Sequence, residues 1–166
     1  TSKEDFGILH VDAHHDLREA YEGFTYSHAS IFYNVLNECK NVSKLIQVGI
    51  RDYSKEEAQR MINLGDKGDC LYDTAMQAQI ATGKSLEEVF APYIEQLPKN
   101  VYISIDIDGL EPLNCPNTGT PVPGGLRYGE LEHLIFMVVK SGRKIIGFDL
   151  VEVGDSKNGW DANVGS

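Results

Sequence analysis

The sequence has 166 residues, of which 42% are hydrophobic and 24% are charged, and its formal net charge is −10 at pH 7. This length and composition suit one globular domain with a hydrophobic core, and the acidic charge argues against a nucleic-acid-binding protein, which needs a basic face. No apolar run approaches the ~20 residues that span a bilayer, which argues against a membrane partner. The three cysteines are far apart and odd in number, which favours the reducing cytoplasm over a disulfide framework.

Strand and helix patterns alternate along the chain. The strand patterns are rich in Ile, Val, Leu or Phe, as parallel strands covered on both faces are. In chain order we predict a strand at 7–14, a helix at 31–38, a strand at 44–52, helices at 54–65 and from residue 85, a strand at 101–109, a helix at 127–142 and a strand at 144–153. This alternation predicts a single α/β domain over residues 1–166, with a parallel sheet in a three-layer α/β/α fold.

Capping signals mark several of these helices. Ser30 is the expected N-cap of the first, and the later pairs Ser54 with Glu57 and Ser85 with Glu88 have the spacing of capping boxes. Glycines at positions 65 and 142 are expected to end their helices. Pro92 is expected to kink or restart the helix that begins after Ser85.

Acidic residues and a histidine follow two of the predicted strands. Asp12 and His14 are two residues apart at the end of the first strand, and Asp106 and Asp108 are two apart at the end of the third. Side chains at i and i+2 share one face of a strand, so each pair should point the same way. Asp16 lies just past the first strand, where the chain can turn it back. Since ligands collect at the carboxyl ends of parallel strands, we expect these side chains to converge.

This donor set predicts a metal centre. Oxygen-rich sites suit Mg²⁺ or Mn²⁺, and the added imidazole favours Mn²⁺. Five donors exceed the needs of one ion, whereas carboxylates that bridge two ions hold them ~3.5–4 Å apart and activate water. One D-x-H or D-x-D motif alone is commonly a solvated turn. Two such motifs, each ending a hydrophobic strand and followed by a long loop (19–27 and 111–125), favour metal-assisted hydrolysis instead.

Longer motifs around these residues resemble those of a known family. "DAHHD" at 12–16, "SIDIDGLEP" at 104–112, "TGTPVPGG" at 118–125 and "VEV" at 151–153 resemble the ureohydrolases, which include arginase and agmatinase. "DAHHDLREAYEG" followed by "YSHAS" is most similar to agmatinases. The resemblance implies an arginase-like fold. The family's first histidine ligand belongs to a glycine-rich motif with no counterpart here. The resemblance therefore implies either a fragment that lacks the N-terminal part and the C-terminal end of a longer ureohydrolase, which we favour, or a truncated form with one incomplete metal site.

The resemblance also implies a set of metal ligands. Asp12 and Asp106 would bridge two Mn²⁺ ions, Asp16 would complete the ligands of one ion, and His14 with Asp108 would complete those of the other.

Three further residues gain roles from the same resemblance. Glu152 would bind the guanidinium group of the substrate by charge-assisted hydrogen bonds. His28 would match the family's proton-shuttling histidine, and Asp108 would share in catalysis. Thr120 would help to orient the substrate or Glu152.

The implied enzyme is a cytoplasmic hydrolase of linear amidines that takes a small cationic guanidino substrate and forms a trimer or hexamer. The reaction that the resemblance favours converts agmatine to putrescine and urea, a step of polyamine biosynthesis. One alternative is an arginase or another amidinohydrolase of guanidino acids. Arginase-like relatives have a small polar residue where this sequence has Arg18, which disfavours arginase, although Arg18 would suit another acid. A domain that keeps metal only for stability is a further alternative. A metal phosphoesterase is disfavoured because the sequence shows no anion-cradling helix start or basic cluster.

Overall fold

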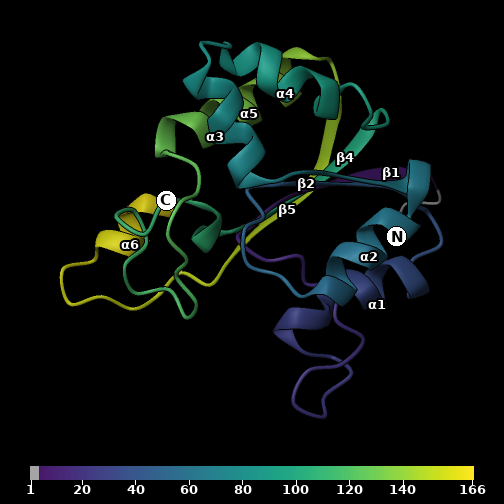
Figure 1. The fold of residues 1–166 in the computed structure, drawn as a ribbon, viewed down its shortest axis with the longest axis horizontal. Helices are drawn as coiled ribbons and strands as arrows, with labels where there is room; N and C mark the ends of the chain where they lie inside the picture. The colour runs from purple at the N-terminus through teal and green to yellow at the C-terminus, as the bar shows by residue number, and fades with distance from the viewer. Residues whose placement is uncertain (1–3) are drawn as a thin grey trace.

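Five parallel strands form one sheet in the computed structural model, which describes residues 4–166 (Figure 1). The first three residues of the predicted domain lie outside the described residues. The strand order across the sheet is β3-β2-β1-β4-β5, and every neighbouring pair is parallel. The strands are β1 (Phe6–Val11), β2 (Val42–Val48), β3 (Gly68–Leu71), β4 (Asn100–Asp106) and β5 (Lys144–Val151).

Helices cover both faces of this sheet. In Figure 1, α3, α4 and α5 lie above the sheet and α1 and α2 lie below it. The helices are α1 (Ile31–Glu38), α2 (Lys55–Asn63), α3 (Asp73–Ala81), α4 (Leu86–Ile94), α5 (Tyr128–Lys140) and the short α6 (Trp160–Val164). The predicted three-layer α/β/α fold with a parallel sheet is therefore confirmed. Among the described helices, none is long and apolar enough to cross a membrane.

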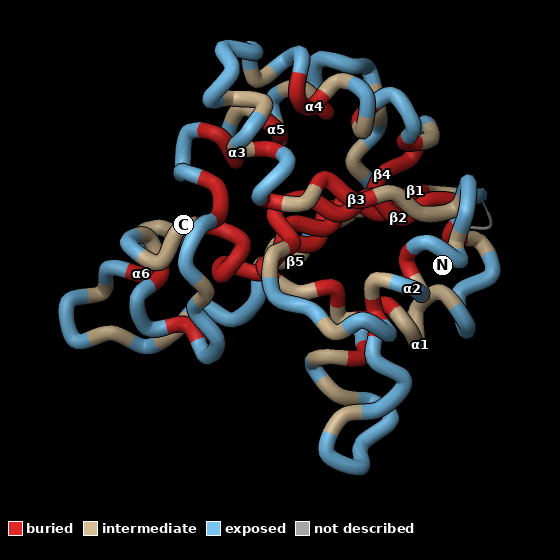
Figure 2. Tube along the Cα trace, in the orientation of Figure 1, coloured by how far each residue is buried: buried red, intermediate tan, exposed pale blue. Residues whose placement is uncertain are grey.

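The sheet separates two hydrophobic clusters, and its strands β1, β2 and β4 are mostly buried (Figure 2). Strand side chains alternate between the clusters because successive residues point to opposite faces. Leu9 and Ile46 belong to the cluster that includes Phe90 of α4. Ile8 and Leu45 belong to the cluster that includes Phe32 of α1. By their spacing, His10 and Gln47 point to the same side as Ile8 and Leu45. Polar side chains therefore enter the layer between the sheet and helices α1 and α2.

The predicted helix signals hold with two corrections. Both capping boxes form, and Gly65 and Gly142 have the positive φ expected of residues that end helices. The expectation that Pro92 interrupts its helix is wrong, because α4 continues through Pro92 to Ile94. Ser30 is the N-cap of α1, but its side chain makes no capping bond and its hydroxyl instead contacts that of Ser27 at 2.7 Å.

The fourth predicted strand is not covered on both faces. In β5, Ile145 and Leu150 pack against the core of the α3–α5 side, whereas Ile146 is 38% exposed and Phe148 75% exposed. Phe148 pairs in register with Ile103 and lines an apolar pocket with Leu131 and Ile135 of α5, so this side of β5 is only partly covered. The expectation of a strand buried on both faces is therefore wrong for β5, which is an edge strand with exposed apolar side chains.

The chain changes direction across the sheet between β1 and β4. From β1 it continues to β2 and β3 on one side, and then returns to place β4 and β5 on the other side of β1. In open α/β sheets, such a switch point forms a crevice at the carboxyl ends of the two strands, and ligands bind there. The predicted acidic motifs follow β1 and β4, so the topology places both at this crevice.

Candidate metal centre and cavity

The turn after β1 brings Asp12 and His14 together. Strand β1 ends at Val11, and the Asp12 carboxylate accepts a hydrogen bond from the His14 backbone N–H at 2.6 Å. His14 Nδ1 lies 3.3 Å from the same oxygen, Asp12 Oδ1. Asp16 adopts a left-handed backbone (φ 53°), and its carbonyl accepts a hydrogen bond from the N–H of Phe32 in α1. The predicted proximity is present, but a turn produces it instead of strand alternation.

Asp108 is not on a strand, which corrects the expectation that it shares a strand face with Asp106. Strand β4 ends at Asp106, whose carboxylate accepts a hydrogen bond from the Asp108 N–H at 2.9 Å and so caps the 3₁₀ helix Ile107–Gly109. The Asp108 carboxylate accepts one hydrogen bond from Ala13 N–H at 3.1 Å. A Cβ at Gly109 would lie 2.8 Å from the Asp12 nitrogen, so only glycine permits this approach.

Two groups of potential metal donors lie at these turns. Donor atoms of Asp12, His14 and Asp108 all lie within 4.8 Å of one another, and those of His10, Asp12 and Asp16 do the same. In the first group, His14 Nδ1 is 3.2 Å from Asp108 Oδ2. Asp12 belongs to both groups, and neither group includes Asp106.

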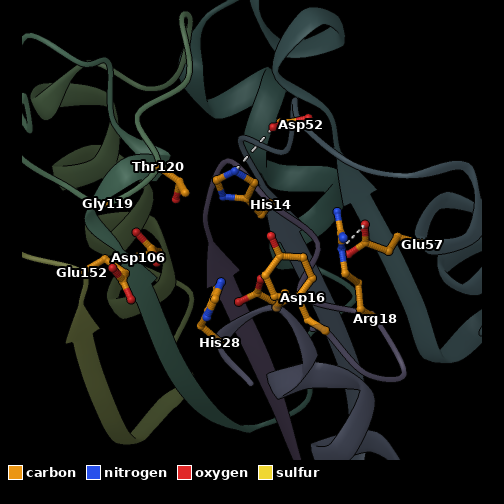
Figure 3. Close-up of a pocket in the computed structure, with 12 residues that line it drawn as sticks. His14, Asp16, Arg18, His28, Asp52, Glu57, Asp106, Gly119, Thr120 and Glu152 are labelled. Atoms are coloured by element: carbon orange, nitrogen blue, oxygen red, sulfur yellow. Dashed lines mark ion pairs between the residues drawn. The ribbon is translucent and has the colours of Figure 1, made fainter. Parts of the chain in front are cut away.

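A cavity of about 380 Å³ opens beside these donors. It is lined by six of the predicted site residues: His14, Asp16, His28, Asp106, Thr120 and Glu152. Figure 3 shows Asp106, Thr120 and Glu152 on one side, and His14 and Asp16 in the middle. The remaining two predicted residues, Asp12 and Asp108, are each 1% exposed. All eight predicted site residues therefore either line this cavity or are buried next to residues that line it.

Two of the loop residues in this region have specific surroundings. His28 is exposed at the start of a 3₁₀ helix, and its ring meets that of Tyr21 edge-on with centroids 5.4 Å apart. Thr120 was expected to orient the substrate or Glu152. Its hydroxyl donates a hydrogen bond to Asp108 Oδ2 at 3.1 Å, which places it beside a predicted metal ligand, and its role toward the substrate stays a prediction.

Glu152 is held in a strained backbone conformation. It directly follows β5 and has φ 58°, a left-handed value that costs a non-glycine residue about 1–3 kcal/mol. Its Oε2 lies 3.3 Å from the position that a Cβ of Gly119 would occupy, so a larger residue at 119 would crowd the carboxylate. Strain of this kind gathers at functional sites, and here it directs an exposed carboxylate into the cavity.

Burial and crowding of negative charge perturb the carboxyl groups. Burial, followed by the charge of Asp12, raises the pKa of Asp16 to about 8 and that of Asp106 to about 9. Burial alone would raise the pKa of Asp12, but contacts with His10 and His14 lower it well below its usual range. Burial would lower the pKa of His14, but hydrogen bonds with Asp108 and Asp12 raise it to about 10. The cluster thus favours added positive charge, as protons or as cations.

The donor set fits divalent cations. The carboxylates and one imidazole are the ligand types that suit Mn²⁺. His14 Nδ1 lies within 3.3 Å of two carboxylate oxygens, a spacing at which the three donors can face one ion. The family resemblance implies two ions, and the carboxylates are compatible with that number, since Asp16 and Asp108 belong to different donor groups that share Asp12.

Three charged residues near the cavity were not among the predicted site residues. Asp52 and Glu57 line it, and Asp52 Oδ2 lies 3.8 Å from His14 Nε2. Asp52 could have been predicted as a site residue from its position at the end of the second predicted strand. Arg51 donates hydrogen bonds to the carbonyls of Asp108, Leu110 and Val122, which ties the loop after β4 to the end of β2.

We expect the metal-free protein to lose thermal stability as the pH rises from about 5 to 9. The carboxyls of Asp16 and Asp106 have folded pKa values of about 8 and 9 against an ordinary 3.8, so in this window the folded state binds more protons than the unfolded state. His14 acts in the same direction, because its stabilising proton is lost between its ordinary pKa of 6.5 and about 10. Melting temperatures measured with a chelator at several pH values test this.

The double variant Asp16→Asn/Asp106→Asn serves as the control for that measurement. It removes both raised carboxyl groups, so its melting temperature should depend less on pH over the same window. A wild-type melting temperature that is constant or rises from pH 5 to 9 would contradict the expectation.

Comparison with known proteins agrees with this geometry. The family model described as "Arginase family" matches residues 1–158. The chain is 39% identical over 155 residues to an N(1)-aminopropylagmatine ureohydrolase of Thermus thermophilus, covering 93% of this chain and 48% of that protein. It is 37% identical to the agmatinase of Halalkalibacterium halodurans, with coverage of 90% and 47%.

A solved structure gives the same result. The proclavaminate amidino hydrolase of Streptomyces clavuligerus superposes with a TM-score of 0.79 at 26% identity, over 96% of this chain and 51% of that one. The chain thus spans about half the length of the curated relatives it matches. These relatives are ureohydrolases, and the family match extends over nearly every residue. The chain belongs to the arginase family.

Proposed function

We propose that this protein is a manganese-dependent ureohydrolase that converts agmatine and water to putrescine and urea. The observation that carries the proposal is the convergence of carboxylates from the ends of three strands on one cavity: Asp16 after β1, Asp106 at the end of β4 and Glu152 after β5. The named relatives, an agmatinase and an aminopropylagmatine ureohydrolase, support the substrate. Because the chain spans half their length, this is a proposal for the whole protein, of which we take residues 1–166 to be one α/β domain.

The five predicted ligands would hold the metal ions: Asp12, His14, Asp16, Asp106 and Asp108. When bound, two Mn²⁺ ions would lower the pKa of water enough to supply a nucleophile near neutral pH. The protein's own part is to fix the carboxylates. Asp108 accepts a hydrogen bond from the Ala13 N–H at one oxygen and from the Thr120 hydroxyl at the other, which fixes the orientation of its carboxylate.

Glu152 would bind the planar guanidinium ion of the substrate. Charge-assisted hydrogen bonds from two guanidinium nitrogens to one carboxylate fix the group in a plane, and fixing the carbon near the metal donors supplies part of the rate by positioning. His28, at the exposed rim of the same cavity, would deliver a proton to the departing amine. The water oxygen would form a bond to the guanidinium carbon, and the C–N bond to the departing amine would break. Both protons of this water would end on the amine, one of them through His28, so the products are urea and a protonated amine.

The setting follows from the same proposal. The substrate is a small cation with no nucleic-acid or membrane partner, in keeping with the net charge of −10. We propose a cytoplasmic enzyme that acts in polyamine biosynthesis as a trimer or hexamer. All three cysteines are free in the structure.

A second candidate is an amidinohydrolase of a guanidino acid, and Arg18 is the observation that favours it. Arg18 lines the cavity, with its guanidinium group 4.9 Å from the Tyr21 ring centroid and its Nε 3.5 Å from Glu57 Oε2. An arginine at this place suits a substrate carboxylate. The Glu57 contact already neutralises part of its charge, however, so we rank this candidate second.

Urea release from a substrate panel separates these candidates. The intact protein, loaded with Mn²⁺, is assayed with agmatine, N(1)-aminopropylagmatine, arginine and 4-guanidinobutyrate. We expect the highest kcat/KM with agmatine. A strong preference for arginine or 4-guanidinobutyrate would establish the second candidate instead. Binding of Mn²⁺ without urea from any of the four would support a domain that keeps metal only for stability.

A further inference from the structure

A buried row of polar side chains leads away from Asp12 into the layer between the sheet and helices α1 and α2. His10 Nε2 lies 2.8 Å from Asp12 Oδ2, and His10 Nδ1 lies 2.9 Å from Gln47 Nε2. Gln47 Oε1 contacts His15 Nδ1 at 2.5 Å, and His15 Nε2 lies 3.3 Å from the Tyr72 hydroxyl. His10 is 2% exposed, and Gln47 and His15 are fully buried. Each of these polar groups must find its partner inside the protein.

The side-chain amide of Gln47 has only one satisfactory orientation. Its Nε2 lies 2.8 Å from the backbone carbonyl oxygen of His15, which can only accept a hydrogen bond. The NH₂ group must therefore face that carbonyl, since the amide oxygen there would repel it. The second N–H of the same group then points to His10 Nδ1, so that ring nitrogen is the acceptor.

The tautomer of His10 follows from this contact. A neutral imidazole has one donor and one acceptor nitrogen, so acceptance at Nδ1 puts the proton on Nε2. Nε2–H then donates to Asp12 Oδ2. The far end is consistent, because Gln47 Oε1 accepts from His15 Nδ1–H and leaves His15 Nε2 to accept from the Tyr72 hydroxyl. With these tautomers, every hydrogen bond in the row has one donor and one acceptor.

This tautomer decides between two roles for His10. By distance alone, His10 forms a possible donor group with Asp12 and Asp16. A nitrogen that carries a proton has no lone pair for a metal, however, so His10 Nε2 is not a ligand. Its hydrogen bond occupies Asp12 Oδ2 and leaves Oδ1 on the side of His14. The Phe32 ring packs against the imidazole with centroids 4.1 Å apart and limits its rotation.

We propose that His10 is a positioning residue that orients the Asp12 carboxylate toward the metal centre, and that Gln47 imposes the tautomer this role requires. The inference rests on the proposed metal-dependent function. Outer-shell partners of this kind fix ligand orientation, and their loss typically weakens metal binding by ~10–100-fold.

Metal affinity of matched variants tests the positioning role. Binding of Mn²⁺ alone to the intact protein is measured by electron paramagnetic resonance for wild type, His10→Leu, His10→Gln and Gln47→Leu. We expect ~10–100-fold weaker binding for His10→Leu. His10→Gln should restore affinity to within a few-fold of wild type, since its amide N–H reaches the place of Nε2–H. His133→Leu, in α5 and paired with Glu87, is the control and should bind as wild type does.

The tautomer is read directly in metal-free protein by ¹⁵N–¹H correlation spectra of labelled histidine. We expect the His10 proton on Nε2 in wild type and a mixture of tautomers in Gln47→Leu. This readout remains if His10→Leu fails to fold. A proton on Nδ1 in wild type, or Mn²⁺ binding unchanged in a folded His10→Leu, overturns the positioning role alone. Wild-type protein that binds no Mn²⁺ overturns the proposed function and this role with it.

Discussion

Replacing Asp12 with asparagine should abolish metal-dependent activity, with a loss of urea release on the order of 1000-fold, as when a preorganised charged group is removed from an active site. Asp12 belongs to both donor groups, so the substitution removes an anionic ligand from each. The side chain is 1% exposed, and asparagine has nearly the same volume, so packing is preserved. Mn²⁺ titration and a urea assay on the same samples measure both effects.

The control for this prediction is Asp66→Asn. Asp66 is an exposed residue of the turn before β3, at the amino end of the sheet and away from the cavity. This variant should keep wild-type affinity and activity. Should Asp12→Asn bind two Mn²⁺ ions as tightly as wild type, the proposed ligand set would be wrong.

Replacing Glu152 with glutamine should lower kcat/KM for agmatine by about 100-fold and leave Mn²⁺ affinity unchanged. A hydrogen bond to a charged group contributes about 1.5–3 kcal/mol, and each 1.36 kcal/mol corresponds to a tenfold change. Glutamine keeps the length and shape of the side chain but cannot neutralise a guanidinium ion. Steady-state kinetics together with a metal titration separate substrate binding from metal binding.

Glu56→Gln is the matched control, because Glu56 is an exposed carboxylate in the first turn of α2. Its kinetics should equal those of wild type. If Glu152→Gln instead weakened Mn²⁺ binding and kept KM for agmatine, Glu152 would have to be reassigned from the substrate to the metal centre.

The sequence was sufficient to predict four strands and the layer architecture because long runs of branched apolar residues identify strands that lie between helices. It was not sufficient for β3, which has four residues and the sequence GDCL. Helix α3 (DTAMQAQIA) was also missed, because its apolar residues do not gather on one face. The exposure of β5 depends on which elements pack beside it, and this cannot be predicted from the residues of the strand itself.

The candidate site shows a similar division. Convergence of Asp12 and Asp106 was predictable, because parallel strands deliver their carboxyl ends to one edge of the sheet. The position of Asp108 was not predictable, because it lies in a 3₁₀ turn that depends on a hydrogen bond from its own N–H to the Asp106 carboxylate. From the sequence, Glu57 was predicted only as half of a capping box. That it also lines the cavity depends on tertiary packing, which the local sequence does not show.

The outer border of β5 has a consequence for handling this polypeptide. Its backbone N–H and C=O groups on that border face no neighbouring strand within residues 4–166, and Phe148 stands 75% exposed beside them. An edge strand with unpaired backbone groups and exposed apolar side chains can pair with strands of other molecules, which promotes aggregation. Produced alone at high concentration, the 166-residue polypeptide should therefore self-associate. Lysine at position 148 should improve its solubility without touching the cavity.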